Sequence, residues 1–343
     1  MKCQLGRGVF MVIRAIAGAE TASTIRKVVI FALKLAITCG CFWYLLLQID
    51  LGDLFAEAAH LTLRWFALAV IVIMVQIPLV AIRWGWITDA LEPKSPRTPL
   101  GPMVAITMIA NFFAQILPNV MSDGIRILML AQIKTGWRRG LAGVVIDRGV
   151  GVGVLLAIGF ITLLSPSPFT ALAGYRRIVL LIFGALFVCG VGGLISARLY
   201  APVFGRYRIT KWAGEFALAS RQALVESPRS LSIVMMAFAI HFLNIACIWS
   251  VGQAFSMSLS LIEAAVLFTL MVAIAIIPIS VSGWGLRELA VTAFLNAHGM
   301  PTQRALLFSI CYGLTLVVAA LPGAAIMLVY SPRKLRRPAV PAV

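Results

Sequence analysis

Six ionisable residues lie inside or directly beside long apolar runs of this chain: Asp123, Arg126, Asp147, Arg148, Arg287 and Glu288. A charge is costly in hydrocarbon, so charged side chains in a membrane pair with one another, bind a ligand or face water. The set holds three acids and three bases, which favours a charge-balanced cavity that recognises an anionic or zwitterionic group. The alternative is that these residues only neutralise one another as packing contacts, or extend to the membrane surface.

The most distinctive of these patterns is the stretch 277–288, which reads IPISVSGWGLRE. Pro278 breaks the helical hydrogen-bond ladder, and a helix is predicted over 286–297. Free N–H groups at the start of that helix favour phosphate, and Arg287 adds a positive charge to its first turn. The same stretch supplies hydroxyl groups and glycines that allow close backbone approach: Ser280, Ser282, Gly283 and Gly285.

The stretch VVIDRGVGVG places Asp147 directly before Arg148, early in another apolar run. Neighbouring side chains on a helix point about 100° apart, so these two residues do not face each other. We therefore expect each of them to have a partner on another element.

The composition indicates an integral membrane protein. Hydrophobic residues make up 61% of the chain and charged residues 12%, and no polar stretch is long enough to form a separate soluble core. The net charge of +17 would suggest nucleic-acid binding in a soluble protein. Here Lys and Arg lie between apolar runs, where they orient a protein in the membrane, so nucleic acid is not an expected partner.

Eight apolar segments are predicted to be helices, since a backbone in lipid must satisfy its own hydrogen bonds. They cover 28–49, 65–87, 103–117, 141–164, 178–197, 231–251, 262–279 and 304–330. The basic, aromatic link 198–230 is typical of an amphipathic helix at the membrane surface. This gives three parts: a basic cytoplasmic segment 1–27, a membrane domain 28–330 and a basic cytoplasmic tail 331–343.

The distribution of Lys and Arg favours six full spans and two segments that enter the membrane and turn back. If all eight segments cross, the basic residues divide almost evenly between the two faces. If the third and seventh segments re-enter instead, most of them fall on the inner face, as expected for a cytoplasmic side. In this count Arg83 is taken as a residue of the inner loop that follows the second segment.

The two segments predicted to re-enter also end alike. LPNVMSDGIR and IPISVSGWGLRE each place an arginine eight or nine positions after a proline, Pro118 or Pro278. One segment would enter from inside and the other from outside. This is typical of an inverted repeat, in which two broken helices meet near the middle of the membrane around a polar cavity.

Cysteine and histidine give no sign of a metal site or a disulfide framework. Five of the six cysteines lie within apolar runs, where a thiol is ordinarily a small hydrophobic group. His60, His241 and His298 are too far apart in the sequence for a metal-binding motif. We expect neither a metal nor another cofactor.

At these three motifs the chain resembles the lysylphosphatidylglycerol synthase transmembrane region, also described as the flippase-like domain family. PISVSGWGLRE is similar to that family's P-x-S-x-x-G-x-G-x-R-E motif, and VVIDRGVGV to its Asp-Arg motif. LPNVMSDGIR resembles its proline-led G-D-x-x-R element, although Met121 and Ser122 stand where the family has glycines.

The resemblance implies a multi-pass protein of the bacterial inner membrane that moves or handles an anionic or zwitterionic lipid. Phospholipids, polyprenyl-linked lipids and hopanoids belong to this class. The soluble aminoacyltransferase domain of bifunctional relatives is missing, so no enzymatic activity is expected. Two alternatives stay open: an accessory subunit that assists a lipid-biosynthesis enzyme, and a membrane-embedded transferase with Asp147 or Glu288 as its base.

Overall fold

The fold was analysed in a computed structural model of the chain. It describes residues 36, 38–41, 43–45, 47, 50–59, 61–94, 97–117, 119–133, 137–165, 174, 176–206, 210–276 and 283–329. The two basic terminal segments, and most of the first predicted apolar segment, lie outside these residues. So do Pro118, Pro278, Ser280 and Ser282 of the predicted motifs.

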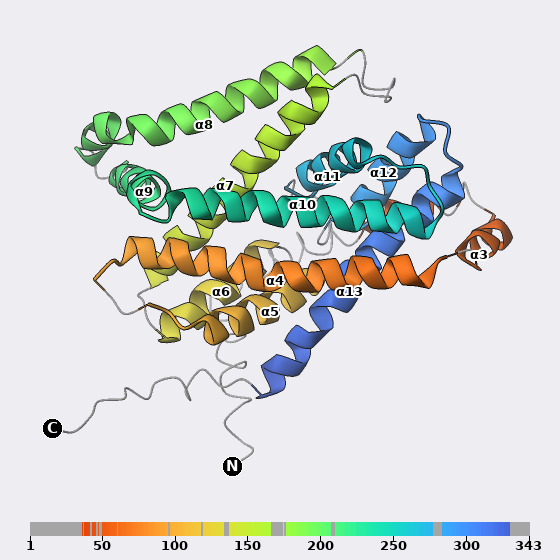
Figure 1. Cartoon of the computed structure of the whole chain (residues 1–343), viewed down its shortest axis with the longest axis horizontal. Helices are drawn as coiled ribbons and strands as arrows, with labels where there is room; N and C mark the ends of the chain where they lie inside the picture. Colours follow the sequence, from red (N-terminus) through yellow and green to blue (C-terminus); the bar gives the residue numbers. More distant parts are fainter. Residues whose placement is uncertain are drawn as a thin grey trace.

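All the secondary-structure elements in the described part of the chain are helices (Figure 1). Five of its helices are long and apolar enough to cross a membrane: α4 (Leu63–Leu91), α7 (Trp137–Leu164), α8 (Arg176–Gly205), α10 (Ser230–Ala254) and α13 (Thr302–Val329). At 29 residues, α4 is about 44 Å long, well over the roughly 30 Å of a bilayer's hydrocarbon core. The chain is therefore an all-α membrane protein, as predicted.

The remaining helices are shorter: α3 (Leu51–Ala59), α5 (Leu100–Ile116), α6 (Asn119–Ile133), α9 (Lys211–Arg221), the π-helical turn η2 (Gln222–Glu226), α11 (Leu261–Ile276) and α12 (Leu286–Asn296). Helix α12 coincides with the helix predicted over 286–297, and α9 lies in the predicted amphipathic link. Helices α3 and α6 were not predicted, because neither is a long apolar run.

Helices α4 and α10 lie side by side and run in opposite directions (Figure 1). The N–H of Thr62, just before α4, donates to the carbonyl of Ala254 at the end of α10, at 2.9 Å. At the other end of α4, the Gln222 side chain donates to the Ala90 carbonyl at 2.9 Å, shortly before α10 begins. These two contacts define the two ends of the molecule, named below the Thr62 end and the Ala90 end.

Two broken helix pairs enter the bundle from opposite ends. The chain leaves the Ala90 end in α5 and returns to it after α6, where Arg139 at the start of α7 forms an ion pair with Glu92. Similarly, α11 leaves the Thr62 end, and the chain returns there after α12, where Arg304 of α13 pairs with Glu57 of α3. This path is what the predicted re-entrant segments require; their position in a membrane stays a prediction.

The helix contacts repeat with a twofold pattern. Helices α4, α5, α6 and α7 correspond in order to α10, α11, α12 and α13, and each contacting pair within one set has its counterpart in the other. Contacts between the sets are exchanged in the same way: α5 packs on α13 as α11 packs on α7, and α4 packs on α13 as α10 packs on α7. Since α4 and α10 run in opposite directions, this pattern supports the predicted inverted repeat.

Arg83 is not a loop residue. It lies within α4 with only 5% of its surface exposed, because α4 continues to Leu91 rather than ending near the charge. The prediction that assigned Arg83 to the inner loop was therefore wrong. Its burial raises the question of what compensates its charge.

Candidate functional site

Arg83 pairs with Asp147, and together they form the centre of a buried ionic network between α4, α6 and α7. Arg83 Nε donates to Asp147 Oδ1 at 2.9 Å, and Arg126 of α6 lies within 3.4 Å of the other oxygen. Asp147 is 2% exposed, so both of its oxygens are held by arginines out of contact with solvent. A buried carboxylate needs such compensation to remain charged.

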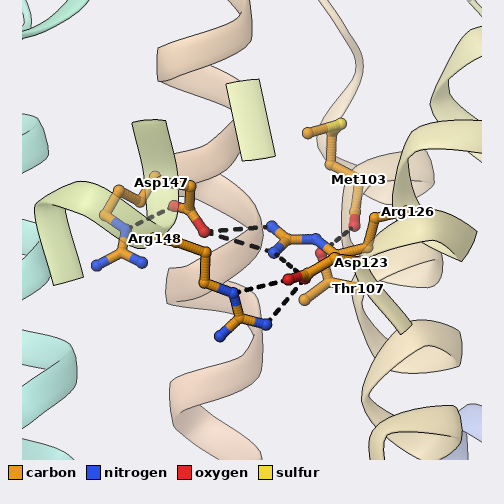
Figure 2. Close-up of polar contacts among 7 residues, drawn as sticks. Met103, Thr107, Asp123, Arg126, Asp147 and Arg148 are labelled. Carbon is orange, nitrogen blue, oxygen red and sulfur yellow. Dashed lines mark hydrogen bonds and ion pairs between the residues drawn. The ribbon is translucent and has the colours of Figure 1, made fainter. Parts of the chain in front are cut away.

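Arg148 points to a different carboxylate. Its Nε and Nη2 donate to the two oxygens of Asp123 at 3.0 and 2.8 Å, which is a two-pronged contact (Figure 2). Arg126 connects the two halves of the network, since its Nη1 also lies 3.7 Å from Asp123. Asp147 and Arg148 thus each have a partner on another helix, as the predicted 100° separation of neighbouring side chains requires.

The network, defined as Arg83, Asp123, Arg126, Asp147 and Arg148, carries a formal charge of +1, since it contains three arginines and two aspartates. Two of its buried donors, Arg83 Nη1 and Arg126 Nε, have no hydrogen-bond partner among the described residues. The Arg126 guanidinium also lies over the Trp84 ring, 4.2 Å from its centroid. The site therefore holds surplus positive charge and two buried donors without a partner among the described residues.

Arg287 and Glu288 form a second, smaller group at the start of α12. Arg287 Nε donates to Glu288 Oε1 at 2.8 Å, and the Ser309 hydroxyl of α13 donates to the same oxygen at 3.3 Å. The Arg287 guanidinium lies over the Trp284 ring, 4.6 Å from its centroid. Unlike Asp147 and Arg148, the neighbours Arg287 and Glu288 contact each other, because the Glu288 carboxylate folds back toward the start of α12.

The Glu288 carboxylate also takes the position that a phosphate would take at this helix start. Its Oε2 accepts the N–H of Gly285 at 2.7 Å, and the side chain is fully buried. Gly283 and Gly285 have φ angles of 83° and 82°, which explains the need for glycine at both. The predicted anion site at Gly285 is thus already supplied with an internal carboxylate.

The six predicted residues fall into two groups. Asp123, Arg126, Asp147 and Arg148 belong to the network with Arg83, whereas Arg287 and Glu288 contact Ser309, Trp284 and Tyr312. In the part of the chain that the structure describes, no ion pair joins the two groups. That both groups line one cavity stays a prediction.

A surface pocket also lies at the Thr62 end, away from both groups. It is lined mainly by polar residues, with three apolar side chains among them: Thr62, Arg64, Trp65, Gln253, Ser256, Met257, Ser258, Leu259 and Ser260. None of the six predicted residues belongs to it.

Sequence reasoning missed Arg83 as a site residue. The signal was present, because Arg83 lies within the predicted second segment, 65–87, and Arg148 was recognised as intramembrane for the same reason. His241, which was set aside as a metal ligand, is also buried in the bundle, in α10.

The family model of the lysylphosphatidylglycerol synthase transmembrane region matches residues 31–323. The chain belongs to this family. The match includes all three motifs and both groups of charged residues, which agrees with the resemblance noted in the sequence. Comparisons with curated proteins and with solved structures gave no significant match. As a member of this family, the chain is a multi-pass membrane protein associated with lipid handling.

Proposed function

We propose that this protein moves an anionic or zwitterionic membrane lipid between leaflets of the bacterial inner membrane. The observation that carries this proposal is the surplus charge of the network. A neutral packing contact would match each arginine with an acid, whereas here three arginines share two aspartates. A lipid phosphate on Arg83 and Arg126 would balance the charge and accept from their unpartnered N–H groups.

The same contacts argue against a membrane-embedded transferase. Such an enzyme needs a base with an oxygen free to take a proton from a substrate. Asp147 has both oxygens held by arginines, and both oxygens of Glu288 accept hydrogen bonds from neighbouring groups. We therefore propose a role in transport rather than catalysis.

Leaflet accessibility in proteoliposomes tests the proposal. Purified protein would be reconstituted with trace fluorescent phosphatidylglycerol, and the rate at which inner-leaflet label reaches a membrane-impermeant quencher would be measured. Arg83→Gln should slow this rate about tenfold or more, since a hydrogen bond to a charged group contributes about 1.5 to 3 kcal/mol.

Arg177→Gln is the matched control. Arg177 is an exposed arginine at the start of α8, so its replacement should leave the rate unchanged. A folded Arg83→Gln protein that moves lipid at the wild-type rate would refute the phosphate site. Wild-type protein that moves no anionic or zwitterionic lipid would favour the accessory-subunit role instead.

A further inference from the structure

His241 is a buried side chain in which one ring nitrogen has a hydrogen-bond partner and the other has none among the described residues. Its Nε2 lies 2.8 Å from the carbonyl oxygen of Gly151 in α7, so Nε2 carries the proton and donates. In the neutral ring Nδ1 is then an acceptor, and it has no partner among the described residues. The ring is 9% exposed and rests against Phe268, with 5.3 Å between ring centroids.

The hydrogen bond to Gly151 places this free acceptor near the network. Gly151 follows Asp147 by four residues and so lies on the same face of α7, one turn further on. A free acceptor on α10 and the free donor Arg83 Nη1 on α4 are thus found beside one stretch of α7.

There is also room beside this stretch. A Cβ atom built on Gly151 would meet no atom within 4 Å, and the same holds for Gly149 and Gly153. By contrast, a Cβ on Gly143, one turn before Asp147, would lie 2.9 Å from the Thr88 side chain. Helix α7 is thus closely packed at Gly143 and open at Gly151.

We propose that His241 selects the lipid head group: Nδ1 accepts a hydrogen bond from a donor group of the head group while the lipid phosphate lies on Arg83. This inference rests on the proposed function. The donor is a hydroxyl group, or an ammonium group that carries N–H, attached close to the phosphate. Head groups that carry only alkyl or quaternary ammonium groups cannot satisfy Nδ1, and a buried acceptor left unsatisfied disfavours their entry.

The test compares lipids that differ in the donor alone. Phosphatidylglycerol and phosphatidylethanol carry the same charge, but only the first has head-group hydroxyls. Phosphatidylethanolamine and phosphatidylcholine are both zwitterionic, and only the first has N–H donors. In proteoliposomes, wild-type protein should move the donor lipid of at least one pair about twofold to tenfold faster than its matched partner. The pair that shows the difference identifies the donor as hydroxyl or ammonium.

His241→Phe should abolish this preference, because phenylalanine keeps the ring against Phe268 but removes both nitrogens. His298→Phe is a matched control. That ring lies in the turn after α12, with its Nδ1 2.6 Å from the Phe294 carbonyl and its centroid 4.7 Å from that of Phe294, so its loss should leave the preference intact. A preference that survives in folded His241→Phe protein would overturn the inference.

Gly151→Leu provides an independent readout if His241→Phe fails to fold. Its side chain enters the open space beside α7 and should slow donor lipids, whereas Gly190→Leu on α8, where space is also open, should not. Unchanged movement in Gly151→Leu protein would overturn the inference. Equal rates for both lipids of each pair in wild-type protein would overturn it while leaving the proposed function standing, and wild-type protein inert toward all four lipids would remove both.

Discussion

Asp147 is the residue on which the network depends, since it is the more buried of the two acids and each of its oxygens lies against an arginine. Asp123, the other acid of the network, is more exposed, and its shortest contacts are with Arg148. Removing the charge of Asp147 would leave Arg83 and Arg126 buried beside each other with no opposite charge between them. The two arginines would repel each other and would also lose their hydrogen bonds to the Asp147 carboxylate.

Asp147→Asn should therefore destabilise the protein by about 3 to 5 kcal/mol, the typical cost of breaking a buried ion pair from one side. Glu215→Gln is a suitable control, because Glu215 is exposed and its pair with Lys211, at 3.9 Å, belongs to the surface class that contributes about 0 to 1 kcal/mol. Unfolding by heat or denaturant in detergent would measure the difference. Equal stability of the two variants would mean that the network charges are solvated.

Sequence reasoning at the residue scale succeeded where local geometry decides. The 100° separation on a helix correctly predicted that Asp147 and Arg148 have partners elsewhere. The identity of those partners is a matter of packing between helices far apart in the sequence, and Arg83 is 64 residues from Asp147. No spacing rule along one segment shows such a contact.

Glycine determines how closely the elements of the repeat approach. A Cβ built on Gly323 of α13 would overlap the carbonyl oxygen of Met108 in α5 and lie 2.7 Å from its carbonyl carbon. In the corresponding pair, a Cβ on Gly159 of α7 would lie 3.0 Å from the Thr269 side chain of α11. At both crossings a small residue brings a long helix onto a broken one.

Gly323→Ala should destabilise the protein, by about 1 to 3 kcal/mol or more, because the clash is with backbone that cannot rotate away. Gly190→Ala in α8 is the control, since a Cβ there meets nothing within 4 Å and alanine favours a helix by about 1 kcal/mol. The two variants should shift the melting temperature in detergent in opposite directions. A neutral Gly323→Ala protein would show that α5 and α13 are less closely packed than described.

The long helices could be predicted from apolar runs, and α12 from the turn that precedes it. Helix α6 could not, because its sequence mixes Asp123, Gly124 and Arg126 with apolar residues and has no run long enough to cross a membrane. It is stabilised by packing on α5 and α7 and by ion pairs to Asp147 and Arg148, which are tertiary features.

At the scale of the whole molecule, basic residues distinguish the two ends. Arg139 pairs with Glu92 and Arg229 lies 3.8 Å from Asp89, so the segments before α7 and before α10 both lie at the Ala90 end. The Thr62 end has fewer basic residues, among them Arg64, Arg177 and Arg304. The sequence count separated Arg139 and Arg229 from Arg64, Arg177 and Arg304 in the same way. It was wrong for Arg83 and Arg126, which it assigned to inner loops, and for Arg287, which it assigned to an outer loop, because all three are buried among the helices.

The Ala90 end should therefore be cytoplasmic, since Lys and Arg accumulate on that side of bacterial membrane proteins. Single cysteines would be placed at exposed positions in protein lacking its native cysteines: Arg138→Cys and Lys211→Cys at the Ala90 end, and Arg177→Cys at the Thr62 end. A membrane-impermeant maleimide added to intact cells should modify only Arg177→Cys, and permeabilised cells should show all three modified. Modification of Arg138→Cys but not Lys211→Cys from outside would contradict α7 and α8 as two full crossings. If both are modified from outside and Arg177→Cys is protected, Lys94→Cys, an exposed position just after α4, decides between two explanations. A protected Lys94→Cys would place α5 and α6 as a full crossing and contradict the re-entrant arrangement, whereas a modified one would keep the fold but reverse its orientation, and with it the face from which a lipid reaches the network.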